Sequence, residues 1–202
     1  MKTISTENTI LEAAKTIFLQ KGFAGARMQE IADEAKINKS MLHYYFRNKE
    51  QLFGRIMKDS VSIIIPKFVA ILDSEDSVIH KFERLVDGYI DTIIANPHIP
   101  MFLLNEISQN RVQYMNEAKE KMMEHGTFQS FMMQIVQEQQ QGVLNPLPPQ
   151  HVMLTVMSLI VFPFMAKPIF KNMLEIPETI YTQMMLERKP IVKKMLKDIL
   201  VK

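Results

Sequence analysis

Apolar positions along this chain recur with the helical period almost from end to end. Between residues 6 and 22, Ile10, Ala14, Ile17 and Phe18 follow the i, i+4, i+7, i+8 spacing of one helix face. The same period predicts short helices at 28–35 and 38–46 and a longer one that starts after Asn48 and carries an apolar stripe as far as Ile71. It predicts further helices at 78–95, 101–109, 112–140, 151–165, 168–174 and 177–200. No segment alternates apolar and polar residues with period two, so we expect an all-α fold without a sheet.

Residues that cap or break helices divide these stripes. Ser5 or Thr6 can cap the first helix and Gly22 can end it, while Asn38 and Asn48 are placed to cap the third and fourth. Pro66 should kink the fourth, because a proline ring displaces the carbonyl group four residues earlier. We expect an N-terminal three-helix domain at 1–48 and a larger helical domain at 49–202.

Charge is distributed unevenly between the two predicted parts. Residues 1–58 hold ten Lys and Arg against six Asp and Glu, whereas the remainder holds fourteen against sixteen. An excess of positive charge at the N-terminus suits an anionic partner, although an imbalance of this size also arises by chance. The most apolar run, 152–164, is too short to span a bilayer, and no signal segment is evident, so we expect no membrane partner and a cytoplasmic location.

Residues 28–48 have the layout of a helix-turn-helix unit. Ala32 is small enough for two helices to cross closely, and Leu42, ten residues later, can lock the second helix against the first. The second helix begins with short polar and basic groups that suit contact with base edges. These are Asn38, Lys39, Ser40, His43 and Tyr44, with Arg27, Arg47 and Lys49 placed to reach phosphates. For Tyr45 and Phe46, the spacing from Leu42 favours a place in the core.

A resemblance to a known family covers roughly residues 5–53. It rests on the segments Ile10–Ala14, Phe18, Gly22–Phe23, Ile31–Ala35 and Lys39–Leu52. Together these resemble the DNA-binding domain of the tetracycline-repressor (TetR) family of bacterial transcriptional regulators. The resemblance implies a homodimer that binds a palindromic operator in double-stranded DNA and is released by a small molecule. Carried over by position, the residues that face DNA are Arg27, Gln29, Lys39, Ser40, Met41, His43, Tyr44 and Lys49.

The chain departs from the family pattern at three positions. Lys36 stands where the turn usually has glycine, which adds a cost of about 1 kcal/mol if the backbone there is left-handed, and its charge is a further candidate phosphate contact. His43 replaces the usual tyrosine of the recognition helix, which would make its contact with DNA sensitive to pH. Arg27 replaces the usual hydroxyl cap of the second helix and cannot accept a hydrogen bond. We therefore expect changed base contacts within an unchanged DNA-binding role.

The C-terminal part is expected to bind a ligand and to form the dimer. Its many methionines suit a core or an adaptable, largely apolar pocket. Candidate polar residues of that pocket are Asn105, Gln109, Tyr114, Gln134 and Thr155. The helices at 151–165 and 177–200 carry the candidate dimer stripes Val152, Val156, Leu159 and Ile160, and Ile180, Met184, Ile191, Met195 and Ile199. Both stripes could instead face their own subunit.

The sequence also bears on two classes of protein other than a DNA-binding regulator. A small helical enzyme is disfavoured, because the chain has no Cys and no His-Glu-x-x-His, Glu-x-x-His or phosphate-loop pattern. We accordingly expect no catalytic residue, no metal site and no cofactor. A helical interaction module that never touches DNA remains the alternative, and it differs in lacking steep salt dependence.

Overall fold

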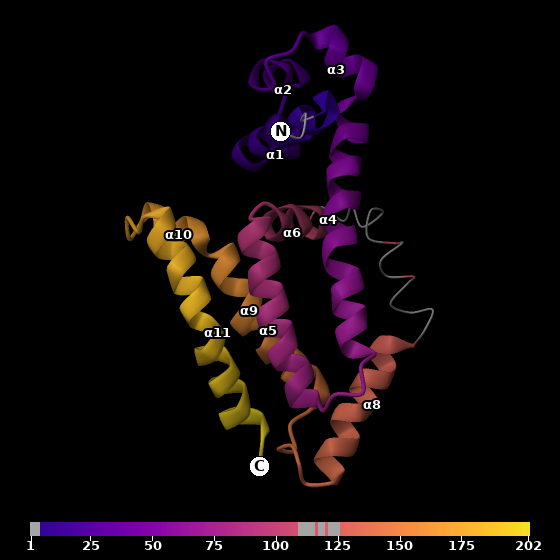
Figure 1. Ribbon diagram of the computed structural model, residues 1–202, viewed down its shortest axis with the longest axis vertical. Coiled ribbons are helices and arrows are strands. Elements are labelled where there is room, and N and C mark those ends of the chain that lie inside the picture. The colour runs from indigo at the N-terminus through magenta and orange to yellow at the C-terminus, as the bar shows by residue number, and fades with distance from the viewer. Residues whose placement is uncertain (1–4, 109–115, 117–119, 121–125) are drawn as a thin grey trace. The chain divides into compact units, whose positions relative to one another are not determined.

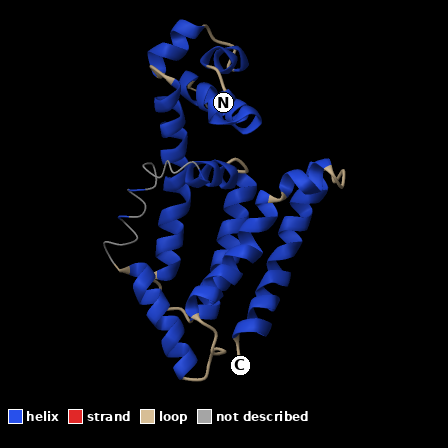
Figure 2. Ribbon diagram, turned by 180° about the vertical axis from the view of Figure 1, so that it is seen from behind, coloured by secondary structure: helices blue, strands red, loops and turns tan. Residues whose placement is uncertain are grey.

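The computed structural model describes residues 5–108, 116, 120 and 126–202, and the regular structure of this part is helical (Figures 1 and 2). Its helices are α1 Thr6–Gly25, α2 Met28–Glu34, α3 Lys39–Tyr45, α4 Lys49–Leu72, α5 Val78–Ala95, α6 Ile99–Ser108, α8 Thr127–Gln140, α9 Pro149–Met165, α10 Lys167–Asn172 and α11 Glu178–Leu200. One isolated antiparallel bridge joins Leu144 to Val201. The predicted all-α class is confirmed. The predicted helix at 112–140 falls partly outside the described residues.

The chain divides into two compact units, and the division falls within α4. The first unit comprises Met1–Ser62 and Met101–Met115, and the second comprises Ile63–Pro100 and Asn116–Lys202. We call them the N-terminal unit and the C-terminal unit. The domain boundary that we place after residue 48 stays a prediction. Within the described residues, no helix is both long and apolar enough to cross a bilayer.

Side-chain caps define the helices of the N-terminal unit. The Ser5 hydroxyl accepts a hydrogen bond from the Asn8 amide at 3.3 Å, and the Asn38 side chain accepts one from the Met41 amide at 2.7 Å. Asn48 does the same for Gln51 at 2.8 Å. Each cap satisfies one of the amide groups that a helix start leaves without a partner. Gly22 has φ 67° and interrupts the helical path of α1 near its end.

One buried cluster holds the helices of the N-terminal unit together. It includes Ile10, Ala14, Phe18, Ile31, Ala32, Leu42, Leu52, Phe53, Ile56, Met57 and Phe102. The rings of Phe18 and Phe53 meet edge to face with centroids 5.0 Å apart, a favoured aromatic geometry. Because α1, α2, α3 and α4 all contribute, the short α2 and α3 are stabilised by packing rather than by their own helix propensity.

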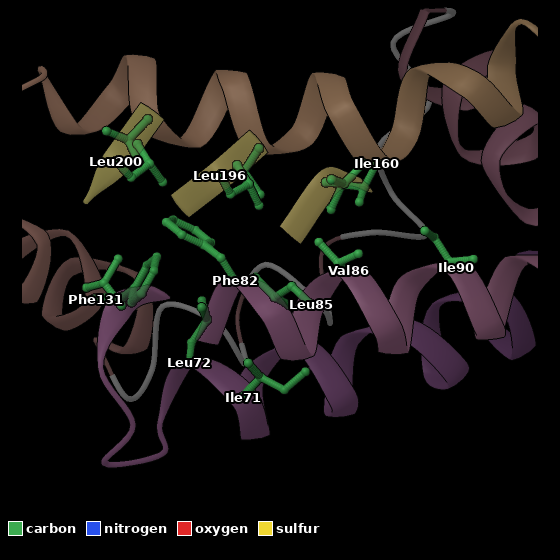
Figure 3. Close-up of a cluster of buried hydrophobic side chains, with 14 of the residues drawn as sticks. Ile71, Leu72, Phe82, Leu85, Val86, Ile90, Phe131, Ile160, Leu196 and Leu200 are labelled. Atoms are coloured by element: carbon green, nitrogen blue, oxygen red, sulfur yellow. The ribbon is translucent and has the colours of Figure 1, made fainter. Parts of the chain in front are cut away.

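The C-terminal unit is built around α5, which packs against α8, α9 and α11 (Figure 1). Figure 3 shows Phe82, Leu85, Val86 and Ile90 of α5 directed into this cluster of buried side chains. Phe131, Ile160, Leu196 and Leu200 meet them from α8, α9 and α11. On the rim, an ion-pair ladder joins α5 to α11 through Asp91–Lys189, Asp87–Lys193 and Glu83–Lys197. Its spacing of four residues on both helices fixes their antiparallel register.

Side chains of α11 also donate hydrogen bonds to backbone carbonyls of α9 near Pro163. Pro163 lies inside α9 and has no N–H, so the Leu159 carbonyl loses its helical donor. The Arg188 Nε atom of α11 donates to that carbonyl at 3.1 Å. The Tyr181 hydroxyl, also from α11, donates to the Pro163 carbonyl at 2.7 Å. Two backbone acceptors of α9 are therefore satisfied by side chains of its neighbour.

Candidate nucleic-acid interface

A tight turn sets α3 against α2. The Ile37 amide donates to the Ala32 carbonyl at 3.0 Å, and Lys36 between the helices adopts φ 56°. The turn therefore keeps the left-handed backbone for which glycine is best suited, although a lysine occupies the position. Ala32 and Leu42 have no exposed surface, as the close crossing of two helices requires. This packing fixes the rotation of α3 and with it the residues that face outward.

The outward side of α3 carries the residues predicted to meet DNA. Lys39, Ser40, Met41, His43 and Tyr44 are all exposed, Tyr44 at 83%. Phe46 is buried as predicted. The prediction that Tyr45 lies in the core is wrong: it is 41% exposed and its ring meets that of Tyr44 edge to face. Leu42 is the buried residue of the helix, so a single side chain anchors α3.

Several cations around α3 have no ion-pair partner among the described residues. They are Arg27, Lys36, Lys39 and Arg47, and all four side chains are exposed. By contrast, Glu7, Glu12 and Glu30 are paired with Arg55, Lys15 and Lys21. Asp33, Glu34 and Glu50 are also exposed and have no ion pair among the described residues. The four unpaired cations are free to contact the phosphate backbone of DNA.

Arg27 and Gln29 make contacts at the start of α2 that leave their outer ends exposed. The Arg27 amide donates to Glu30 Oε2 at 3.2 Å, so Glu30 supplies the cap that the Arg27 side chain cannot. Gln29 donates to Asp33 at 2.8 Å. The Lys21 ammonium hydrogen-bonds Glu30 and lowers the pKa of that carboxyl group. The cap is therefore an ionised carboxylate, the form that a helix N-terminus stabilises best.

Lys49 makes a contact that sequence reasoning missed. Its ammonium donates to the Ala26 carbonyl at 2.9 Å and to the Ala24 carbonyl at 3.4 Å, and it lies 4.6 Å from the centre of the Phe23 ring. Its side chain is half-buried. Lys49 thus joins the start of α4 to the end of α1. A role as a phosphate contact stays a prediction, since two of its three N–H donors are already used.

Of the five polar residues predicted for an effector pocket, the structure describes the side chains of Gln134 and Thr155. Gln134 accepts from the buried Lys81 ammonium at 2.7 Å and donates to Glu138 and to the Asp76 carbonyl, so its amide is used within the core. Burial lowers the pKa of Lys81. Thr155 lies on α9, and Asn105 lies in α6, where its side chain is not among those described. Gln109 and Tyr114 lie outside the described residues.

The C-terminal unit contains a small cavity and a larger groove. The small cavity, of about 30 Å³, lies between α4 and α5 and is lined by Ile64, Lys67, Phe68, Ile71, Leu85, Gly88, Tyr89 and Thr92. An open groove of about 850 Å³ runs between α8 and α9, lined by Phe128, Gln129, Met132, Met133, Val136, Gln137, Pro149, Gln150 and Met153. Three methionines of the groove belong to the set that the sequence marks as adaptable. Its aromatic residue, Phe128, had no distinguishing signal in the sequence.

The two predicted dimer stripes have different surroundings. On α11, Ile180, Ile191, Met195 and Ile199 are exposed and Met184 is half-buried. On α9, the prediction is wrong for Val152, Val156 and Ile160, which are at most 2% exposed because they pack into the core of their own unit. Leu159 is half-buried. The outward apolar residues of α9 are instead Leu154, Met157 and Phe162.

The buried crossing of α2 and α3, with unpaired cations and exposed polar groups around it, defines a helix-turn-helix domain of the DNA-binding type. The described residues contain no group of three or more His, Cys, Asp or Glu that could hold a metal ion. Residues 10–56 match the profile of the family described as bacterial regulatory proteins, tetR family. This segment is therefore a DNA-binding domain of the kind that TetR-family transcriptional regulators carry, and members of that family are not enzymes.

Individual relatives are similar over different spans. The chain is 31% identical over 105 residues to the HTH-type transcriptional repressor SCO4008 of Streptomyces coelicolor, a match that spans half of each protein. It is 26% identical over 169 residues to the probable HTH-type transcriptional regulator YttP of Bacillus subtilis, covering 80% of this chain and 78% of that protein. The similarity to SCO4008 thus leaves half of that repressor unmatched.

Solved structures share this fold over most of their length. The ketosteroid transcriptional regulator KstR2 of Mycobacterium tuberculosis superposes with a TM-score of 0.74 at 16% identity, covering 100% of this chain and 97% of that one. The hemolysin II transcriptional regulator HlyIIR superposes with a TM-score of 0.58 at 26% identity, covering 88% and 96%. The low identity to KstR2 means that this likeness concerns the fold alone.

Proposed function

We propose that this protein is a homodimeric repressor that binds a palindromic operator in bacterial DNA and is released from it by a small, largely apolar molecule. The observation that carries the DNA-binding part is the face of α3, where Lys39, Ser40, His43 and Tyr44 are exposed around unpaired cations. The face is held by Leu42 and the cap at Asn38 rather than by the exposed residues themselves. Such a protein acts in the cytoplasm, where bacterial DNA lies.

A dimer follows from the way helix-turn-helix units read DNA. Two half-sites lie about 34–36 Å apart or at multiples of that distance, so two copies of α3 are needed. The exposed apolar residues of α11 and α9 supply a surface that a second copy would cover. They are Leu154, Met157, Phe162, Ile180, Ile191, Met195 and Ile199. Single exposed apolar residues are ordinary, but seven on two adjacent helices favour an interface.

The open groove between α8 and α9 is the proposed effector site. Its wall is mostly apolar, and Met132, Met133 and Met153 can adjust to ligands of different shape. The glutamines at 129, 137 and 150 give a bound molecule polar groups to orient against. Met133→Glu should abolish binding of the apolar dye 1-anilinonaphthalene-8-sulfonate without weakening the protein's affinity for DNA. Unchanged dye binding would place the effector elsewhere.

DNA binding is tested with the DNA upstream of the gene that encodes this chain. Arg27→Ala, Lys39→Ala and Tyr44→Ala should each weaken binding at least several-fold while the protein stays folded. Lys202→Ala, which removes an exposed lysine of the C-terminal unit, is the matched control and should change nothing. If the affinity falls by the same amount in every variant, or in none, the assigned face is wrong.

Salt dependence separates the proposal from a helical interaction module that does not bind DNA. Each phosphate contact adds about one to the slope of log affinity against log salt, so binding should weaken steeply between low and physiological salt. The dimer is tested separately by sedimentation. Met195→Glu should give monomers, whereas Leu19→Glu, an equally exposed residue of α1 at 43%, should leave the dimer intact.

A further inference from the structure

His43 is held by a backbone carbonyl group. Its Nδ1 atom lies 3.0 Å from the carbonyl oxygen of Arg47, just beyond the end of α3. The side chain is otherwise exposed on the face of α3 that carries Lys39, Ser40 and Tyr44. Resting on the DNA-binding function proposed above, we propose that His43 reads a base by accepting a hydrogen bond at Nε2, and so selects a cytosine or an adenine at one position of the operator.

The tautomer follows from the partner. A carbonyl oxygen can only accept a hydrogen bond, so Nδ1 must carry the proton in this contact. A neutral imidazole has one N–H, which leaves Nε2 with a lone pair and no hydrogen. The bond also restricts the rotation of the ring, because Arg47 lies in the short bend between Phe46, the C-cap residue of α3, and the start of α4. The free edge of His43 is therefore a single acceptor in a fixed orientation.

An acceptor at this place selects among the groups in the major groove. Cytosine presents its N4 amino group there and adenine its N6 amino group, and both are donors. Guanine O6 and N7, thymine O4 and phosphate oxygens are acceptors and cannot pair with a bare Nε2. His43 therefore reads a base rather than the backbone, in contrast to the cations around it. The contact of His43 therefore favours particular bases and does not increase the salt dependence of the affinity for DNA.

His80 of α5 shows why the identity of the hydrogen-bond partner matters. His80 Nδ1 lies 3.1 Å from the Ser77 hydroxyl, which can either donate or accept. That contact does not fix a tautomer. His80 lies on α5 in the C-terminal unit and is 65% exposed, so it serves as the matched control.

The first experiment selects binding sites from a pool of random DNA with wild-type protein, His43→Ala and His80→Ala. We expect one base pair of each half-site to lose its preference in His43→Ala alone. If the wild type selects no sequence, the proposed DNA-binding function fails. If it selects an operator that His43→Ala selects equally well, the function stands and the inference about His43 is overturned.

The second experiment identifies the atom that is read. At the affected base pair, adenine is replaced by purine or cytosine by 2-pyrimidinone, each of which lacks the amino group. We expect the wild type to lose about three- to tenfold in affinity, the range of one neutral hydrogen bond, and His43→Ala to lose nothing. 7-Deazapurine analogues, which lack only the N7 acceptor, should leave wild-type affinity unchanged. A loss with those analogues instead would show that Nε2 donates.

Two further measurements do not depend on the operator. In nitrogen-15 NMR spectra of the free protein above neutral pH, the His43 ring should show a protonated Nδ1 and an unprotonated Nε2. The slope of affinity against salt should be the same for His43→Ala and wild type, whereas a cationic phosphate contact would reduce it by about one. The opposite tautomer, or a reduced slope, would overturn the proposal.

Discussion

Lys49 offers a direct test of which lysines stabilise the fold and which contact DNA. Lys49→Met keeps most of the apolar stem and removes the ammonium that donates to the Ala26 and Ala24 carbonyls at 2.9 and 3.4 Å. A hydrogen bond from a charged donor contributes about 1.5–3 kcal/mol, and the longer bond adds little. The contact with the Phe23 ring, 4.6 Å away, adds about 0.5–1 kcal/mol at a partly exposed site. Because the side chain is half-buried, we expect a total loss of about 2 kcal/mol in the free energy of unfolding.

Two assays distinguish this role from a phosphate contact. Urea unfolding measures the stability, and DNA binding at several salt concentrations measures the number of phosphate contacts. Lys49→Met should lower the stability by about 2 kcal/mol and leave the salt slope unchanged. Lys39→Met, in an exposed lysine on α3, should do the reverse: unchanged stability and a slope smaller by about one. A reduced slope with unchanged stability in Lys49→Met would refute the assignment.

Three further predictions concern the fold. Tyr181→Phe leaves the Pro163 carbonyl without its donor and should lower the free energy of unfolding by about 1–3 kcal/mol in urea, whereas an unchanged midpoint would mean that another donor replaces it. Burial raises the pKa of both Tyr89 and Tyr181 to about 12, above the ordinary value, so their protonated forms stabilise the fold below about pH 10 and this contribution is lost between pH 10 and 12. Replacing both by Phe should flatten the fall in stability over that range, and a parallel fall would contradict it. Lys36→Gly removes a side chain at φ 56° and should raise the stability by about 0.5–1 kcal/mol, measured by thermal unfolding; destabilisation would show that Lys36 makes a stabilising contact.

The helix caps were the most predictable part of the fold. Ser5, Asn38 and Asn48 act on amides only three residues away, so sequence spacing contains the whole interaction. The buried residues of α1 to α4 follow a period that one helix face imposes. The exposed face of α3 follows from these, since Leu42 fixes its rotation. The helices and the packing of the helix-turn-helix unit could therefore be predicted from the sequence, whereas the exposed position of Tyr45 could not.

Interactions between distant segments were not predictable in the same way. Lys49 binds backbone carbonyls 23 and 25 residues away, and a carbonyl group has no signature in the sequence. Gln134 is a candidate pocket residue because it is polar, but its partner Lys81 lies 53 residues earlier. On α9, Val152 and Leu154 belong to different faces that are both apolar. Periodicity could identify the helix and could not decide which face was buried.

The first four helices separate the residues that make the fold from those proposed to read DNA. Backbone groups are hydrogen-bonded by the side chains of Glu30, Asn38 and Lys49. Leu42 is the buried residue of α3. The exposed side chains of α3 take no part in these interactions. His43 differs from the others, because its ring is hydrogen-bonded on one side to the Arg47 carbonyl. Because the reading residues contribute little to packing, the sequence that α3 recognises can change while the helix stays in place. His43 is the exception: its hydrogen bond ties what it can recognise to the shape of the helix end.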